Sequence, residues 1–407
     1  MEITQLDETA LRKVRTACSE LFSEDLAQDD KFIEGLDLEA VEKAYWQKAK
    51  KSYLHLHPLS SKEQASEFLL EIRNSYETLA SYLQENVQAV EDTARKGKVI
   101  AIGGAKGGIG KSVVAANLGV LLSAKGFKVA LVDLDLGGAN LHLCLGNKVL
   151  LQKNINDFLK KRVDTLQEIM IKSEYGPYLI GGDSSELGAA NIEFGRKLRL
   201  LKAVEHINAD FIILDLGGDT SYNIIDFFLK ADFGIVLTTR DSASYIGAYH
   251  FLKAAMYRRF NRIFGPESKF KSYKNADLER LIREAIAPVG GSGPKTINDL
   301  LERVREEQPA HFSFVNDVVA TFRSYLIVNK IPTDLLSAID VNPIVTRIQQ
   351  VTKTWLSKEV AYLGAISQQA QIETSMIDLV PVVAKYPKGK TASELSSIVA
   401  KLFEEGL

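Results

Sequence analysis

The sequence predicts an α/β protein built on a mostly parallel sheet of about seven to eight strands, with helices covering both faces. From residue 98 onward, short β-branched runs are separated by helix-length segments, which is typical of parallel β-α-β units. The runs are continuously apolar rather than alternating, as expected for strands buried on both faces. The six runs lie at 98–104, 128–133, 178–182, 211–216, 234–239 and 325–330.

A small, all-helical domain is predicted to precede the sheet. Residues Leu36–Gln84 contain neither a glycine nor an alternating β-type run. Two long helical patterns flank His57-Pro58, and the second opens with Ser60 and Glu63 at the spacing of a capping box. The stretch 91–98 is charged and poorly periodic, which indicates a linker. The predicted divisions are a helical domain at 1–90, a linker at 91–97 and the α/β domain at 98–407.

One connection in the α/β domain is unusually long. The predicted strands at 234–239 and 325–330 are about 85 residues apart, far more than one crossover helix requires. The excess contains two further helical patterns, Ala276–Ala287 and Thr296–Glu307, and the second opens with a capping-box spacing. We therefore expect a folded helical insertion at about 262–318.

Composition excludes several classes of protein. The 407 residues carry 50 basic and 52 acidic side chains, so the net charge of −2 argues against a wholly basic nucleic-acid binder. The two cysteines, Cys18 and Cys144, are too few for a disulfide framework or a four-thiolate cluster within one chain. Because there is neither a basic, apolar leader nor an apolar run of about 18 residues, we expect a cytoplasmic protein.

The strongest chemical signal is the stretch 101–122, where an apolar strand enters a glycine-rich turn and then a helix. This order predicts a loop whose backbone N–H groups surround a phosphate at the positive end of the helix. Lys111 is predicted to reach the β- and γ-phosphates, and the Ser112 hydroxyl to bind Mg²⁺. The other predicted nucleotide-binding residues of this phosphate loop are Gly107, Gly108, Ile109, Gly110 and Val113.

With a second lysine, Lys106, the loop reads K-G-G-x-G-K-S and the chain resembles the deviant Walker A ATPases of the MinD/ParA superfamily. The resemblance covers nearly all of 97–405, and the stretch 187–204 and the C-terminal region most resemble the FlhG (FleN)/MinD branch. It implies a P-loop fold, ATP and Mg²⁺ as ligands, and a homodimer that forms on ATP binding, in which Lys106 contacts the partner subunit's nucleotide. The lack of cysteine pairs argues against the iron–sulfur relatives, so we expect no such cluster.

Carboxylates end two of the predicted strands, where a parallel sheet places its ligands. The resemblance makes the first pair switch I, with Asp135 positioning the attacking water and Asp133 near Mg²⁺; a structural role for Asp133 stays open. Asp215 ends a later strand in the Walker B arrangement and is expected to hold a water of Mg²⁺. Gly218 of switch II is expected to sense the γ-phosphate through its amide.

Two features of this pattern are less regular. Switch II departs from the usual family form and adds Asp219, an extra carboxylate that leaves the rate of hydrolysis open. Asn329 ends the strand at 325–330 and resembles the asparagine with which the family reads adenine, although asparagine is common at strand ends.

Three other segments bear on partners. Residues 253–274 carry seven Lys or Arg with interleaved aromatics, a pattern that fits nucleic acid, lipid headgroups or an acidic partner. The alternative is a solvated helix face whose aromatics lie in the core of the insertion. The last helix, 393–405, has an apolar face but ends in acids, which favours packing on the sheet over membrane binding. The N-terminal region resembles a J-domain, although Leu59 replaces the aspartate of its His-Pro-Asp motif.

The leading hypothesis is a dimeric, ATP-hydrolysing switch of the MinD/FlhG type, slow and stimulated by a partner. It is expected to control the placement or number of a flagellum, a division site or another polar assembly. The alternatives are a ParA-type partitioning ATPase that binds DNA through 253–274, and an adaptor that acts through its J-like domain.

Overall fold

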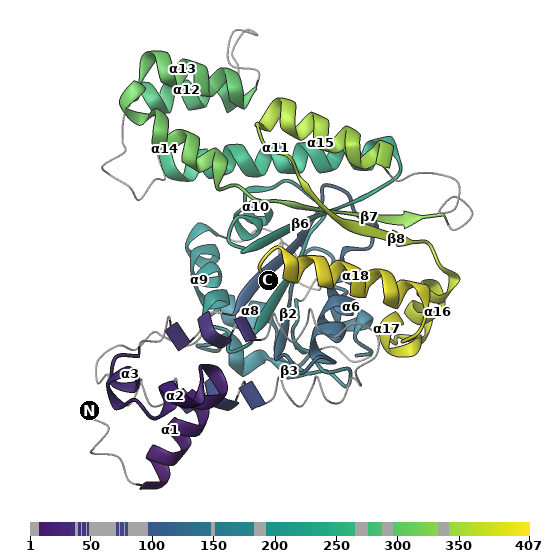
Figure 1. The fold of residues 1–407 in the computed structure, drawn as a ribbon. Helices are drawn as coiled ribbons and strands as arrows, with labels where there is room; N and C mark the ends of the chain where they lie inside the picture. Colours follow the sequence, from purple (N-terminus) through teal and green to yellow (C-terminus); the bar gives the residue numbers. More distant parts are fainter. Residues whose placement is uncertain are drawn as a thin grey trace.

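The computed structural model contains an eight-stranded sheet lying between helical layers (Figure 1). It describes residues 8–36, 40–41, 43–45, 47–48, 71–72, 74–76, 78–79, 97–147, 151–182, 193–264, 276–286, 296–332 and 342–407. The strand order is β3-β4-β2-β5-β1-β6-β7-β8, and neighbouring strands are parallel except β3 and β4. The strands are β1 (Lys98–Gly103), β2 (Val129–Leu134), β3 (Ile171–Lys172), β4 (Tyr178–Ile180), β5 (Phe211–Leu216), β6 (Phe233–Thr239), β7 (Tyr325–Ile331) and β8 (Ala361–Ser367). The predicted fold class is confirmed.

Alternating side chains of the central strand β1 enter two separate cores, one on each face of the sheet. Ile100 and Ile102 pack in the core that also contains the buried residues of α6 (Lys111–Ser123) and α18 (Lys390–Glu404). Val99 and Ala101 pack in the core on the other face. Because both faces are covered, the inner strands β2, β5 and β6 are buried along their whole length, and they are apolar except near their carboxyl ends.

The remaining helices of the α/β region cover these faces or connect the strands. They are α7 (Leu141–Cys144), α8 (Ile155–Leu159), the 3₁₀ helix η2 (Leu166–Ile169), α9 (Phe194–Glu205), α10 (Tyr222–Phe228), α11 (Ser242–Phe264), α15 (Asn342–Leu356), α16 (Ala370–Asp378) and α17 (Val382–Lys385). Buried residues of α9, α10, α11 and α15 belong to the second core, opposite α6 and α18.

The last helix, α18, packs on the sheet, and the prediction of a core helix is confirmed. Leu395, Ile398 and Val399 are buried, and the Phe403 ring lies 5.8 Å from Phe127 and 6.0 Å from Phe211. Within the described ranges, no helix combines the length and the apolar character needed to cross a membrane.

Between β6 and β7 the described residues form α11 and then α12 (Ala276–Ile286), α13 (Ile297–Glu307) and α14 (Pro309–Ala320). Figure 1 shows them as a group at one end of the molecule, next to α11 and α15. The capping box predicted at Thr296 is confirmed, since its side chain accepts from the Asp299 amide and the Asp299 carboxylate accepts from the Thr296 amide. The glycine-rich stretch 290–294 lies outside the described residues, and 262–318 remains a prediction as a domain boundary.

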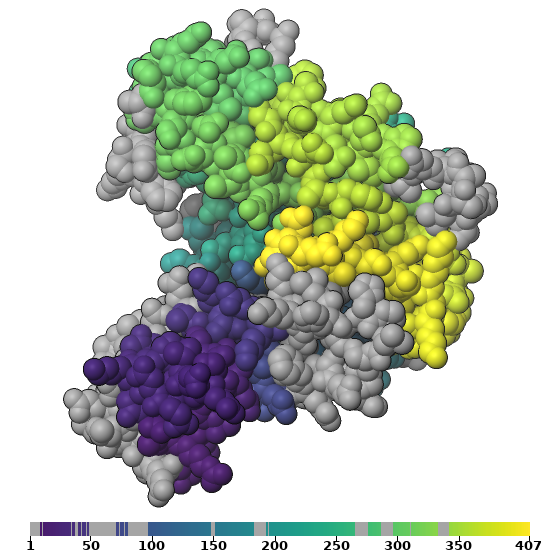
Figure 2. Space-filling view, in the orientation of Figure 1, coloured from purple at the N-terminus to yellow at the C-terminus, as the bar shows by residue number. Residues whose placement is uncertain are grey.

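The described N-terminal residues are helical and include α1 (Glu8–Leu21), α2 (Glu24–Ala27) and α3 (Asp30–Glu34). Buried side chains such as Cys18, Tyr45 and Tyr76 belong to the same cluster as the core on the α6 and α18 face of the sheet. Figures 1 and 2 show α1–α3 at the end of the molecule away from α12–α14. The motif His57-Pro58-Leu59, the Ser60 capping box and nearly all of the linker 91–97 lie outside the described residues, so the J-domain likeness stays a prediction.

The described half of the basic and aromatic segment 253–274 is largely internal. Tyr257, Phe260 and Phe264 are buried in α11, which matches the alternative of a helix with core aromatics. Arg259 donates to the carbonyl and hydroxyl of Thr321. Arg258 is 4% exposed, so it contributes little to an outer cationic surface.

Arg258 belongs to a buried ion cluster that joins three helices. Its Nε lies 2.8 Å from Oδ1 of Asp226 on α10, and Lys197 Nζ of α9 lies 2.6 Å from Oδ2. Burial alone raises the pKa of Asp226, but hydrogen bonds from Arg258 and Lys197 outweigh burial and hold that pKa below its usual value. The carboxylate is therefore charged at neutral pH and pairs with both buried cations.

Replacing Asp226 by alanine leaves two buried cations without this partner, and we expect the free energy of unfolding to fall by about 3–5 kcal/mol. Urea denaturation followed by circular dichroism measures the change. Asp378→Ala is the control, because Asp378 pairs with Lys385 at the surface, where such pairs contribute little. Equal stability of the two variants would contradict a supporting role for the buried cluster.

Candidate functional site

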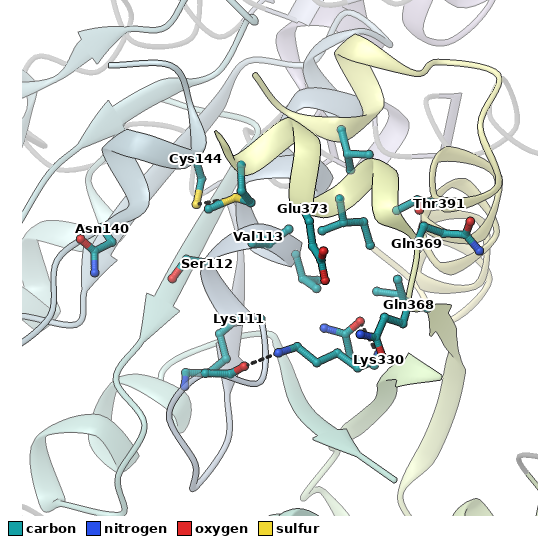
Figure 3. A pocket seen from close by; sticks show the side chains of 18 of the residues that line it. Lys111, Ser112, Val113, Asn140, Cys144, Lys330, Gln368, Gln369, Glu373 and Thr391 are labelled. Carbon is teal, nitrogen blue, oxygen red and sulfur yellow. Dashed lines mark hydrogen bonds between the residues drawn. The ribbon is translucent and has the colours of Figure 1, made fainter. Parts of the chain in front are cut away.

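The carboxyl ends of the strands border a cavity of about 610 Å³ (Figure 3). The loop after β1 and the first turn of α6 form one wall, and the end of β7 with residues 366–369 forms another. Figure 3 shows Glu373 of α16 pointing into this space across from Lys330. Its lining includes most of the predicted phosphate loop together with Asp135 and Asn329: Gly107, Gly108, Gly110, Lys111, Ser112, Val113, Asp135 and Asn329.

The phosphate loop has the backbone expected of an anion cradle. Gly108 and Gly110 have φ values of 73° and 96°, a left-handed region that side chains disfavour. Helix α6 begins directly after Gly110, and no side chain caps its first amides. These N–H groups remain available for an anion at the positive end of a 13-residue helix.

Lys111 lies under the loop and is 6% exposed. Its Nζ donates to the Lys106 carbonyl over 3.1 Å, inside the same loop. Burial lowers the pKa of Lys111, while the carboxylates of Asp215, Asp135 and Asp219 act in the opposite direction. The structure thus brings the predicted loop lysine and three of the predicted acids into one electrostatic cluster.

Lys106 is partly exposed and pairs with Asp241, whose Oδ1 lies 3.0 Å from Nζ. Asp241 also accepts from the Thr239 hydroxyl and the Ser244 amide. Hydrogen bonds from Thr239 and Lys106 lower the pKa of Asp241 to about 2. Sequence reasoning missed Asp241, although its place between a strand and the first turn of α11 is a cap-like signal.

The parallel register of β2 and β5 places Asp133 directly beside Asp215. Burial, followed by the nearby Asp215, raises the pKa of Asp133 well above its usual value. The Asp133 carboxylate accepts from the amides of Asp135 and Leu141, at 3.2 and 3.1 Å, so it holds the turn after β2. Its metal role stays a prediction, and its hydrogen bonds match the structural alternative.

Asp215 is 1% exposed, and among the described residues neither of its carboxylate oxygens has a hydrogen-bond partner. Burial raises its pKa to about 7, while the Ser112 hydroxyl and then the Lys111 ammonium act to lower it. A buried carboxylate without a partner is costly unless a cation joins it. Carboxylate and hydroxyl oxygens are the ligands that Mg²⁺ prefers, so Asp215 and Ser112 fit a magnesium ion.

The two predicted switch segments meet at the phosphate loop. A Cβ placed on Gly217 would lie 3.4 Å from Asp135 Oδ1, which puts the switch I carboxylate against switch II. A Cβ on Gly218 would lie 2.8 Å from the Gly107 nitrogen. The backbone of switch II therefore touches the loop so closely that a side chain at 218 would displace one of them.

Asn329 lies at the loop rather than free in the cavity. Its Nδ2 donates to the Ile109 carbonyl over 2.8 Å, and its Oδ1 accepts from the Lys330 amide. A Cβ on Gly110 would lie 2.5 Å from that Nδ2, so glycine is needed there for contact as well as for φ. Both ends of the amide are thus in use, and adenine reading stays a prediction.

Comparison with known proteins identifies the family. The model of the CobQ/CobB/MinD/ParA nucleotide binding domain matches residues 100–379. The chain belongs to this nucleotide-binding family. The match spans every strand of the sheet from β2 to β8 together with the phosphate loop.

Several relatives within this CobQ/CobB/MinD/ParA family are similar to the chain. The flagellum site-determining protein YlxH of Helicobacter pylori is 35% identical over 171 residues, 42% of this chain and 57% of YlxH. The antiactivator FleN of Pseudomonas aeruginosa is 26% identical over 158 residues, 38% of this chain and 55% of FleN. The chain thus spans little more than half the length of these relatives. Because the relatives include YlxH, FleN and MinD proteins, the predicted resemblance to the FlhG (FleN)/MinD branch is confirmed.

The fold is also similar to a solved structure of this family. The MinD cell division protein of Aquifex aeolicus superposes with a TM-score of 0.50 at 18% identity, covering 76% of this chain and 98% of MinD. At that identity the likeness concerns the fold alone.

Gly218→Ala tests the contact between switch II and the loop. Because the added Cβ would approach the Gly107 nitrogen to 2.8 Å, we expect at least about tenfold weaker nucleotide binding, measured by calorimetry. Gly195→Ala is the control, since no described atom comes within 4 Å of a Cβ there and alanine favours helix. Unchanged affinity in Gly218→Ala would contradict the close contact.

Asp215→Asn tests the buried charge. With a folded pKa of about 7 against an ordinary 3.8, protonated Asp215 stabilises the metal-free protein below pH 4, and this stabilisation is lost as the pH rises through 7. In EDTA, the free energy of unfolding of the variant minus that of wild type should therefore increase by on the order of 2–4 kcal/mol between pH 4 and pH 8. Denaturation at each pH measures the difference, and a constant difference across this range would contradict the raised pKa.

Proposed function

We propose that this chain is an ATP- and Mg²⁺-dependent switch that hydrolyses ATP, dimerises when ATP is bound, and positions a cellular assembly by recruiting a partner. The observation that carries this proposal is that Lys106, Lys111, Asp135 and Asp215 lie around one glycine-rich loop at the carboxyl ends of the central strands. In this proposal, the amides of the loop and Lys111 bind the phosphates. Mg²⁺ held by Ser112 and Asp215 offsets their negative charge.

Asp135 is the residue proposed to orient the attacking water. It lines the cavity and lies against the switch II backbone. A change in switch II on phosphate binding would reach Asp135 directly, because the Gly217 backbone packs on its carboxylate and Gly218 packs on the loop. This arrangement supports a site in which nucleotide state and switch geometry are coupled.

Lys106 is the residue proposed to contact the partner subunit's nucleotide. In the structure its ammonium is about half exposed and holds Asp241 of the same chain. To reach a phosphate of a second subunit, the side chain must exchange this carboxylate. A phosphate bears more charge than a single carboxylate, which supports an exchange driven by ATP.

The biological role rests on the relatives. YlxH is named for flagellum site determination, and FleN is named an antiactivator. We propose that this chain has a comparable role in the placement or number of a flagellum, a division site or another polar assembly, with slow, partner-stimulated hydrolysis.

The two alternatives receive less support. A DNA-bound ParA-type role through 253–274 is weakened, since Arg258 and the aromatics of the described half are buried. An adaptor role of the J-like domain depends on His57-Pro58-Leu59, which lies outside the described residues.

The proposal predicts that ATP with Mg²⁺, but not ADP, raises the solution mass from 45.0 kDa toward twice that value, as measured by light scattering. Asp135→Ala is expected to hydrolyse ATP more slowly and should therefore stay dimeric longer than wild type. Lys106→Ala should bind ATP with unchanged affinity yet stay monomeric.

Asp241→Asn is the matched variant for Lys106, since it keeps the shape of the side chain and removes the charge that holds the lysine. We expect it to dimerise at a lower ATP concentration than wild type. A monomeric Asp135→Ala protein at saturating ATP would contradict the switch, and ATP-dependent, salt-sensitive retention on DNA would favour the ParA-type alternative.

A further inference from the structure

Two consecutive residues at the end of β7 hold two consecutive carbonyls of the phosphate loop. Asn329 Nδ2 donates to the Ile109 carbonyl, and Lys330 Nζ donates to the Gly108 carbonyl, each over 2.8 Å. Figure 3 shows the Lys330 side chain extending along the cavity to this carbonyl, with the bond drawn as a dashed line. The contacts join segments that are about 220 residues apart in the sequence.

The backbone is distorted where this contact is made. Lys330 has a φ of 56°, a left-handed conformation that a residue with a side chain adopts at a cost. The pairing of β7 with β8 also shifts register between Val328 and Ile331. Strand β7 departs from regular geometry at the point where its side chains contact the phosphate loop. Such a local departure indicates a functional constraint at that point.

The geometry of the peptide bond shows how the contacts of Lys330 and Asn329 orient the amides of the loop. In a trans peptide the carbonyl of one residue and the N–H of the next point in opposite directions. Holding the Gly108 carbonyl toward Lys330 therefore turns the Ile109 N–H away from Lys330. Holding the Ile109 carbonyl toward Asn329 does the same for the Gly110 N–H. Two amides of the loop are fixed in direction before any anion arrives.

We propose that Lys330 is a positioning residue of the phosphate site, which fixes the Ile109 amide for an oligophosphate by holding the Gly108 carbonyl. The inference rests on the proposed function, since it assumes that this loop binds nucleotide. Lys330 acts through the loop and not through the nucleoside. Inorganic tripolyphosphate, which has no base or ribose, should therefore depend on Lys330 as much as ATP does.

The test compares four variants by calorimetric titration with ATP·Mg²⁺ and with tripolyphosphate·Mg²⁺. Lys330→Met keeps the aliphatic stem and loses the donor, and Lys330→Arg keeps a cationic donor. Lys330→Gly removes the side chain but relieves the left-handed backbone. Lys353→Met changes an exposed lysine of α15 and is the control.

We expect Lys330→Met to weaken both ligands by the same factor, about tenfold, because a hydrogen bond to a charged donor is lost. Lys330→Arg should recover most of the affinity, and Lys353→Met should match wild type. Lys330→Gly should bind as weakly as Lys330→Met while melting no lower than wild type without ligand, which separates loss of the donor from loss of folding.

Three results would overturn the inference while leaving nucleotide binding intact. They are equal affinities in Lys330→Met and wild type, a loss confined to ATP, and an arginine variant as weak as the methionine variant. A wild-type chain that binds neither ligand would instead reject the proposed function itself.

Discussion

A buried carboxylate, Asp215, is the constraint on which the site depends. The pairing of β5 with β1 and β2 places it near the carboxyl end of a central strand, under the phosphate loop and beside Asp133. Its oxygens are removed from water and lack hydrogen-bond partners among the described residues. Lys111 offsets part of this charge, but a bound triphosphate would compete for that lysine. In the proposed function, a cation that enters with the nucleotide takes over the neutralisation of this carboxylate.

The cations around the loop share one property, which is that each holds an acceptor of its own chain. Lys111 donates to the Lys106 carbonyl, Lys106 to the Asp241 carboxylate and Lys330 to the Gly108 carbonyl. In the proposed function, the first two lysines exchange these acceptors for phosphate oxygens, whereas the third holds the shape of the loop. The positive charge that an anion needs is thus assembled in advance, and little reorganisation remains for binding.

The sequence predicts the parts of this arrangement that depend on local pattern. The apolar runs at 98–104, 128–133 and 211–216 reveal the central strands, and the glycine and lysine spacing reveals the loop. Asp241 and Lys330 were missed because they meet the loop across 135 and 222 residues, a distance that no local pattern encodes. Charge counting likewise treated Arg258 as part of a surface patch, since the sequence does not reveal its buried partner Asp226.

We propose that nucleotide and metal bind together because Asp215 needs a cation once the phosphates engage Lys111. Calorimetric titration of the wild-type chain with ATP, in Mg²⁺ and again in EDTA, tests it most directly. We expect saturable binding to one site per chain in Mg²⁺, weakened at least about tenfold in EDTA. Equal affinity under the two conditions would contradict it.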